Sequence, residues 1–165
     1  MNRLMTPEHL HVALNHLPLI GLAASLLPLC YGLLRKNTEV ITIALCMCLL
    51  FGASTVAVMW TGEAAEDRFE KSSVLTPLDS MGKKWMAIHE DRAKIAAIAG
   101  YLAVAVCLAS LVAKRYGAKY LMLGAWATSL MLVVAIILMA WVADSGGQIR
   151  HPEFRTGAHR TSALL

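Results

Sequence analysis

The sequence predicts an all-α protein, a bundle of four transmembrane helices. Apolar residues make up 58% of the chain and charged residues only 16%, which is more apolar than an ordinary soluble domain. The apolar residues are concentrated in four runs, at roughly residues 10–34, 40–60, 95–112 and 120–142. Each run is long enough for a helix to cross a hydrocarbon core of about 30 Å. We therefore expect residues 1–165 to form a single integral membrane domain.

The first apolar run opens with the signals of a helix start. Thr6 suits the N-cap, Pro7 suits the first helical position, and Glu8 lies where the helix dipole favours a carboxylate. Pro18 and Pro28 predict kinks, because each lacks a backbone donor. The run has no basic n-region and no small-residue cleavage site, so we expect it to be retained as a span.

The segment that follows the second run has acidic residues on one helical face. They are Glu63, Glu66, Asp67 and Glu70. We expect a short amphipathic helix on the membrane surface between the second and third spans, with a cation site or proton relay as the alternative. The third helix is then expected to run unbroken from about Leu78 to Val112.

The fourth helix is expected to end near Asp144. Gly146 and Gly147 follow, and a glycine pair is a common helix stop. A turn at this pair would lay Arg150 and His151 across the mouth formed by the first and third spans.

The charges of the loops predict the orientation. The loops at residues 35–38 and 114–119 are short and densely cationic, so they are expected to be cytoplasmic. Both termini are then extracytoplasmic. We therefore expect a multi-pass protein of the bacterial inner membrane, with its histidine-rich end facing the periplasm. All six histidines fall on that side: His9, His11, His16, His89, His151 and His159.

The histidines of the first span mark a candidate functional site, because an imidazole below the membrane surface is costly unless something binds it. His9 and His16 share one helical face, and His11 points roughly the opposite way. We therefore expect His16 to be the deeper, inward-facing candidate, with His9 or His11 as its partner. The alternatives are solvated histidines at positions 9 and 11, and a His16 that is hydrogen-bonded to a neighbouring helix.

The cysteines do not suggest a disulfide framework. Cys46 and Cys48 diverge by about 200° on a helix, and together with Cys30 and Cys107 they are typical of small core residues. There is no Cys-x-x-Cys-His motif for covalent haem attachment.

Three short motifs resemble those of a known family. They are His16-Leu17-Pro18 in the first span, His89 at the start of the third, and the Gly-Gly-x-Ile-Arg-His-Pro-Glu sequence at residues 146–153. Together they resemble a widespread bacterial family of small four-helix membrane proteins that is suspected of binding haem. The resemblance implies the fold and the membrane location, and adds little about the chemistry.

The leading functional hypothesis is a membrane-bound b-type cytochrome. Haem in a membrane bundle commonly takes two imidazoles from facing helices, here His16 and His89, with His9, His11 or His151 as alternative ligands. The haem propionates would pair with Arg92, Arg150 and Lys94. Such a protein would relay electrons between membrane quinol, or a larger respiratory complex, and a periplasmic cytochrome or other redox partner. It would act as a subunit of a complex or as a homo-oligomer.

Two other hypotheses remain open. The first is a copper or zinc protein without haem, with His16, His89 and His151 as ligands. The second is a structural subunit of a membrane complex, in which the histidines only form hydrogen bonds. No activated nucleophile or phosphate loop is recognisable, which makes an autonomous hydrolase or kinase a poor candidate. The net charge of +4 is scattered, which is not typical of nucleic-acid binding.

Overall fold

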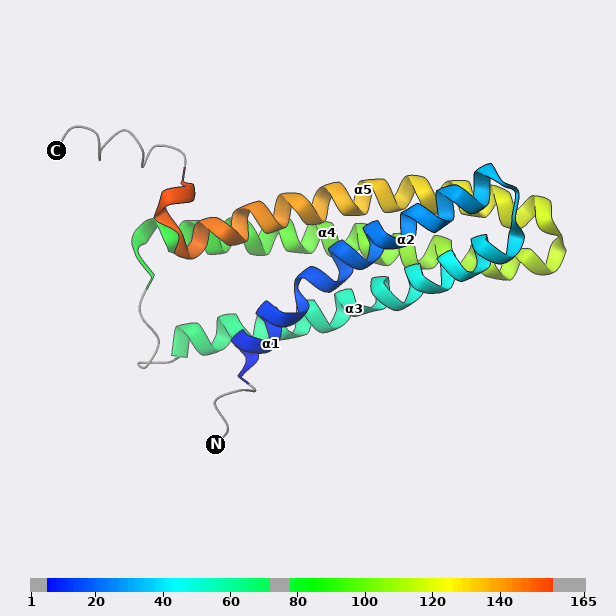
Figure 1. The fold of residues 1–165 in the computed structure, drawn as a ribbon. Helices are drawn as coiled ribbons and strands as arrows, with labels where there is room; N and C mark the ends of the chain where they lie inside the picture. The colour runs from blue at the N-terminus through cyan, green and yellow to red at the C-terminus, as the bar shows by residue number, and fades with distance from the viewer. Residues whose placement is uncertain (1–5, 72–77, 156–165) are drawn as a thin grey trace.

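The computed structural model describes residues 6–71 and 78–155, and these residues form helices without any strand (Figure 1). The helices are α1 (Pro7–Leu14), α2 (His16–Leu34), α3 (Thr38–Lys71), α4 (Ser80–Ala113) and α5 (Ala118–Arg150). Two short 3₁₀ turns, η2 (Lys114–Tyr116) and η3 (Pro152–Phe154), follow α4 and α5. Within the described residues, four helical segments are long and apolar enough to cross a membrane, with α1 and α2 together making the first. The predicted four-span architecture is thus confirmed.

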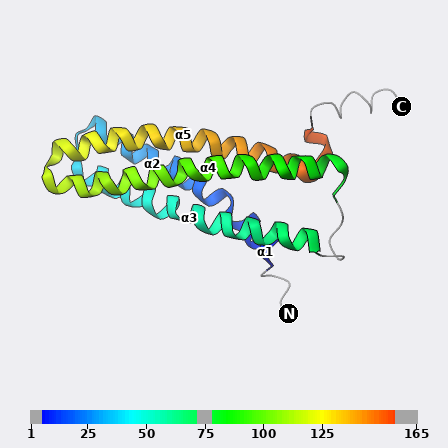
Figure 2. The same ribbon diagram turned by 180° about the vertical axis from the view of Figure 1, so that it is seen from behind.

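The bundle consists of two helical hairpins. In the first, α1 and α2 pack on α3, and in the second, α4 packs on α5. The hairpins lie side by side through contacts of α3 with α4 and of α2 with α5 (Figures 1 and 2). The loops at residues 35–37 and 114–117 lie at one end. We call the other end, which holds α1, the end of α3, the start of α4 and the end of α5, the histidine end.

Small and apolar residues fill the space between the helices. The fully buried apolar side chains include Leu22, Leu29, Ile41, Leu45, Leu121 and Leu132. Small residues such as Ala103 and Ala125 let the helix backbones approach closely, as is common in membrane bundles. Large apolar side chains such as Leu27, Leu50 and Ile137 are exposed on the outside. An apolar exterior of this extent fits a surface covered by lipid.

Two helices extend further than the sequence predicted. Residues 61–71 continue α3 directly and do not form a separate amphipathic helix. Similarly, α5 runs through Gly146 and Gly147 to Arg150, so the glycine pair does not end the helix. At Gly146 the missing side chain has a packing role instead, because the ring of His89 lies against it.

Each hairpin is closed at the histidine end by an arginine and an acid. In the first, Arg68 near the end of α3 pairs with Glu8 at the start of α1, with 3.2 Å between Nε and Oε1. In the second, Arg155 donates to both oxygens of Asp79, at 2.6 and 3.2 Å, and to the carbonyls of Gln148 and Ile149. Asp79 also caps α4, since it accepts the amide of Gly82.

Candidate functional site

His11 on α1 is half-buried and bonded to α3. Its Nδ1 lies 3.2 Å from the carbonyl oxygen of Val58 and 3.4 Å from Oγ1 of Thr61. A carbonyl can only accept a hydrogen bond, so Nδ1 carries the proton. Gly62 lies directly beneath the ring, where a Cβ atom would be only 3.1 Å from Cε1 of His11. The imidazole therefore rests on a stretch of α3 that has no side chain to displace it.

His89 on α4 has the same arrangement with α5. Its Nδ1 lies 3.0 Å from the carbonyl oxygen of Val142 and 3.3 Å from Oγ of Ser145. A Cβ at Gly146 would again be 3.1 Å from Cε1 of the imidazole. The two hairpins thus share one pattern, a carbonyl followed three residues later by a hydroxyl and then directly by a glycine. It is formed by Val58, Thr61 and Gly62 in the first hairpin and by Val142, Ser145 and Gly146 in the second. We call each histidine with these three residues a half-site.

This arrangement leaves each imidazole ready to bind a metal. With the proton held on Nδ1, the lone pair of a neutral imidazole is on Nε2. Neither Nε2 has a hydrogen-bond partner in the described ranges. A ligating histidine typically donates its other ring N–H to a carbonyl or carboxylate, which fixes the tautomer and the ring direction. Both half-sites therefore have the anchoring expected of a metal-binding histidine.

The two half-sites belong to different hairpins at the histidine end of the bundle. His11 on α1 and His89 near the start of α4 both lie at this end (Figure 1). However, α1 contacts α2 and α3 but neither α4 nor α5, with all residues of α1 described. The hairpins thus diverge where the two histidines lie, and Figure 1 shows α1 set apart from α5.

His16 is not brought into the bundle. The buried residues of α2 form a stripe that includes Pro18, Leu22, Ser25 and Leu29, whereas His16 is exposed. Continued towards the N-terminus at the same spacing, this stripe reaches His11. The expectation that His16 faces inward is therefore corrected, since the inward face of the span is the one that carries His11.

The other predicted histidines lie outside the pair. His9 is exposed, with its Nδ1 2.7 Å from Oγ1 of Thr6. His151 is exposed as well and pairs with Glu153 at 2.9 Å, with Phe154 stacked beside it. His159 lies outside the described residues.

Arg92 is the cation that lies closest to His89 in the chain. Its side chain is only 16% exposed and lies one helical turn beyond His89 on α4. Nη1 donates to the carbonyl of Trp141 at 3.1 Å and to Asp144 at 3.4 Å. The guanidinium also lies 5.8 Å from the ring centre of Trp85 and 4.3 Å from that of Trp141. The planar guanidinium is thus held in place beside the second half-site.

The two other predicted cations have different surroundings. Arg150 lies over the ring of Phe69, at 4.7 Å, and so links the ends of α5 and α3 rather than crossing the mouth of the site. Lys94 is paired with Glu90 at 2.6 Å on the surface of α4. Of the three cations, Arg92 is the one that stands closest to a half-site along the chain.

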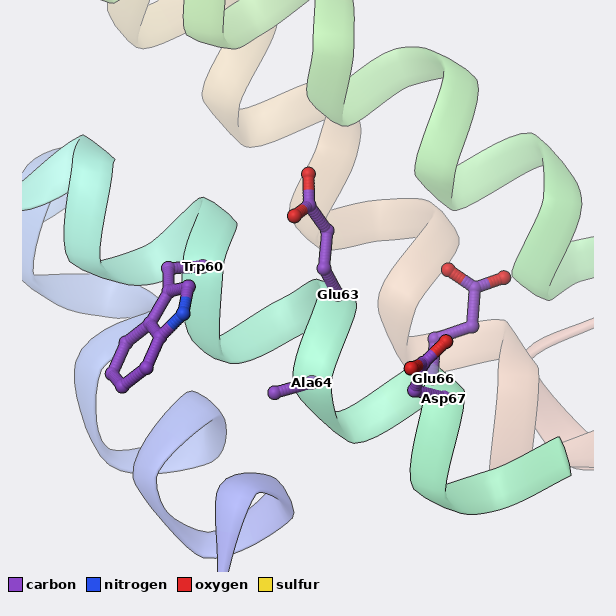
Figure 3. Close-up of a pocket in the computed structure, with 5 residues that line it drawn as sticks. All are labelled: Trp60, Glu63, Ala64, Glu66 and Asp67. Carbon is purple, nitrogen blue, oxygen red and sulfur yellow. The ribbon is translucent and has the colours of Figure 1, made fainter. Parts of the chain in front are cut away.

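The acidic residues of α3 line an open hollow of about 480 Å³, together with Trp60 and Ala64 (Figure 3). The acids are Glu63, Glu66 and Asp67. Figure 3 shows that Trp60 and Glu63 leave α3 on different sides, so the side chains do not converge on one point. No group of three or more His, Cys, Asp or Glu side chains that could hold a metal ion occurs in residues 6–71 and 78–155.

Sequence reasoning missed the residues that anchor the histidines, which are Thr61, Gly62, Ser145 and Gly146. A signal was present, because Thr61-Gly62 directly follows the second apolar run and Ser145-Gly146 comes three residues after the fourth. It becomes visible only when the two hairpins are compared as repeats of one unit. No family model, curated protein or solved structure matches the chain.

Proposed function

We propose that this protein is a membrane-bound b-type cytochrome that holds haem between His11 and His89. The observation that carries the proposal is the pair of matched half-sites, each with an anchored Nδ1 and with an Nε2 that has no hydrogen-bond partner among the described residues. Two imidazoles from facing helices are the common ligand set of haem in membrane bundles. His11 takes the place that the sequence analysis gave to His16.

Each half-site has a defined role in this proposal. The carbonyls of Val58 and Val142 keep the proton on Nδ1, and the two glycines give the rings room to lie flat against the helix. Arg92, held close to the rings of Trp85 and Trp141, would supply a positive charge for a ligand carboxylate such as a propionate. A haem held by His11 and His89 would supply a one-electron centre at this end of the bundle.

Haem is favoured over a bare copper or zinc ion by the number of protein ligands available. A structural zinc site needs four donors and a catalytic one commonly three. The described residues group no third His, Cys, Asp or Glu with the two histidines. Haem needs only two, because its macrocycle supplies the other four nitrogens.

The proposed role is electron relay at one membrane surface. The cationic loops at residues 35–38 and 114–119 favour a cytoplasmic position for their end of the bundle. The proposal is therefore that the histidine end faces the periplasm of a bacterial inner membrane. Electrons would pass between membrane quinol, or a larger redox complex, and a periplasmic partner. If His11 and His89 both bound the haem iron, the site would suit electron transfer rather than substrate binding.

Histidine substitutions test the proposal. The protein is purified in detergent from cells supplied with haem, and its reduced-minus-oxidised visible spectrum is recorded. We expect a b-type signature that His11→Ala and His89→Ala abolish and that His16→Ala, the matched control on the exposed face, leaves intact. A signature that survives in His11→Ala but is lost in His16→Ala would contradict the assignment. A flat wild-type spectrum with stoichiometric copper or zinc would favour the bare-metal alternative.

A further inference from the structure

The two ends of the bundle differ in how their charges are partnered. We call the end formed by residues 35–39 and 114–119 the loop end. It has a single acid, Glu39, and its exposed cations are Arg35, Lys36, Lys114, Arg115 and Lys119. Lys114 donates to Oγ1 of Thr42 at 2.9 Å, which is a neutral partner. The ion pairs described above all lie at the histidine end, and none of the loop-end cations is in an ion pair with a described residue. The loop end therefore presents a positive charge that the protein does not neutralise.

The outer face of α4 is hollowed next to this charge. The hollow is open, has a volume of about 470 Å³ and is lined by Ala105, Leu108, Ala109, Val112, Ala113 and Tyr116. Leu108, Val112 and Tyr116 are each more than half exposed, so the hollow lies on the surface that would face lipid. At 1.5 Å per residue it follows α4 and the turn after it for about 16 Å. This length is close to half of a hydrocarbon core about 30 Å thick, which is the depth of one leaflet.

We propose that this hollow binds an acyl chain of an anionic phospholipid, whose phosphate is held by the cations of the loop end. Tyr116 lies where the apolar hollow meets the charged loop, and tyrosine is common at the level of the lipid headgroups. Arg115 is its neighbour in the chain, and Lys119 follows in the first turn of α5. A guanidinium can donate two parallel hydrogen bonds to a phosphate, and basic residues just outside the apolar core attract anionic headgroups. The site needs neither haem nor the histidines, so it is independent of the proposed function.

A second copy of the chain fits the hollow less well than a lipid does. Two copies in one membrane have the same orientation, so contact through this face of α4 would bring two cationic loops together. Glu39 is the one acid in residues 35–39 and 114–119, and like charges placed against each other at an interface cost free energy. An anionic lipid instead brings the negative charge that the loop end lacks.

Lipid binding tests the role of the headgroup. The protein is purified in detergent and stripped of lipid, and dioleoylphosphatidylglycerol or dioleoylphosphatidylcholine is then titrated and counted by native mass spectrometry. The chains of the two lipids are identical, so a difference in affinity reports on the headgroup. We expect the anionic lipid to bind at least five-fold more tightly. Arg115→Gln should lower its affinity about five-fold, which corresponds to about 1 kcal/mol for one cation near an anionic headgroup.

Lys94→Gln is the matched control for the headgroup, because Lys94 is on the same helix but is paired with Glu90 at the histidine end. It should leave the affinity unchanged. Equal affinities of the wild type for the two lipids, or equal losses in Arg115→Gln and Lys94→Gln, would overturn the proposal.

Filling the hollow tests the role of the acyl chain. Ala109→Leu places a larger side chain in the hollow and should lower the affinity for both lipids several-fold, because contact with the chain is lost. Ala127→Leu is the control, since Ala127 is also exposed and lies about as far from the loop end on α5. Circular dichroism melts check that both variants are folded. An unchanged affinity in Ala109→Leu would overturn the proposal. A wild-type dimer that Ala109→Leu converts into a monomer would assign the hollow to a second copy, and would overturn it as well.

Discussion

At the scale of single residues, the function proposed here depends on two glycines as much as on two histidines. Gly62 and Gly146 lie where a side chain would meet an imidazole ring. Glycine in a helix interior costs about 1 kcal/mol relative to alanine, so its presence in both half-sites opposes helix stability. The need for space beside the two imidazole rings explains why glycine is present at these positions in spite of this cost.

Gly146→Ala is therefore expected to stabilise α5 and still weaken haem binding. The new Cβ would be 3.1 Å from Cε1 of His89 and would force the ring to shift. Overpacking of this kind costs about 1–3 kcal/mol, so we expect a fall in haem affinity of roughly 10-fold. Haem titration of the apoprotein measures it.

The adjacent Gly147→Ala provides the control. A Cβ there would meet nothing closer than Phe154 at 3.6 Å, so the helix gains the same propensity without contact with His89. Equal haem affinities in the two variants would show that Gly146 has no part in seating the ring.

At the residue scale, the sequence predicts that His16 faces the bundle, whereas the structure leaves His16 exposed and half-buries His11. His9, His11 and His16 are close in sequence, and polarity alone does not say which of them faces the bundle. The stripe of buried residues Pro18, Leu22 and Ser25 shows which face of the helix points into the bundle. The same face carries His11. Hydrophobicity could not show this stripe, because in a membrane the outer face of a helix is as apolar as the inner one.

At the scale of elements, the ends of the helices were harder to predict than the helices themselves. The length and apolar composition of the runs were sufficient for the four spans, which the structure confirms. The glycine pair in α5 was taken as a stop, and it is helical because Gly146 packs on His89, a contact distant in sequence. Local rules for helix ends cannot include a contact of this kind.

The Asp79–Arg155 pair predicts a pH dependence for the second hairpin. The hydrogen bonds from Arg155, with a smaller contribution from the Gly82 amide, hold the pKa of Asp79 below its usual range. A lowered carboxyl pKa means that the contribution to stability is complete above the unfolded pKa and is lost as the pH falls through the folded pKa. We therefore expect the closure to persist at neutral pH and to weaken only below about pH 4.

The comparison of wild type with Asp79→Asn measures this contribution. Melting temperatures from circular dichroism in detergent should differ at pH 7, with the variant lower, and should converge as the pH falls below about 4. A difference that stays constant across this range would mean that the charge on Asp79 does not contribute.

At the scale of the whole molecule, the bundle is one hairpin design used twice. Each hairpin contributes a histidine on its first helix, a carbonyl, a hydroxyl and a glycine on its second, and an arginine that closes the open end. The hairpins differ in one respect, because Asn15 separates α1 from α2 in the first, whereas α4 of the second is one helix from Ser80 to Ala113.

The central claim is that His11 and His89 together hold haem, and chemical rescue tests it most directly. His11→Gly removes the imidazole without adding a new side chain, and free imidazole can then enter the space it leaves. We predict that the b-type visible spectrum is lost in His11→Gly and returns when imidazole is added, whereas His16→Gly keeps the spectrum throughout. A wild-type spectrum in His11→Gly without added imidazole would contradict the account.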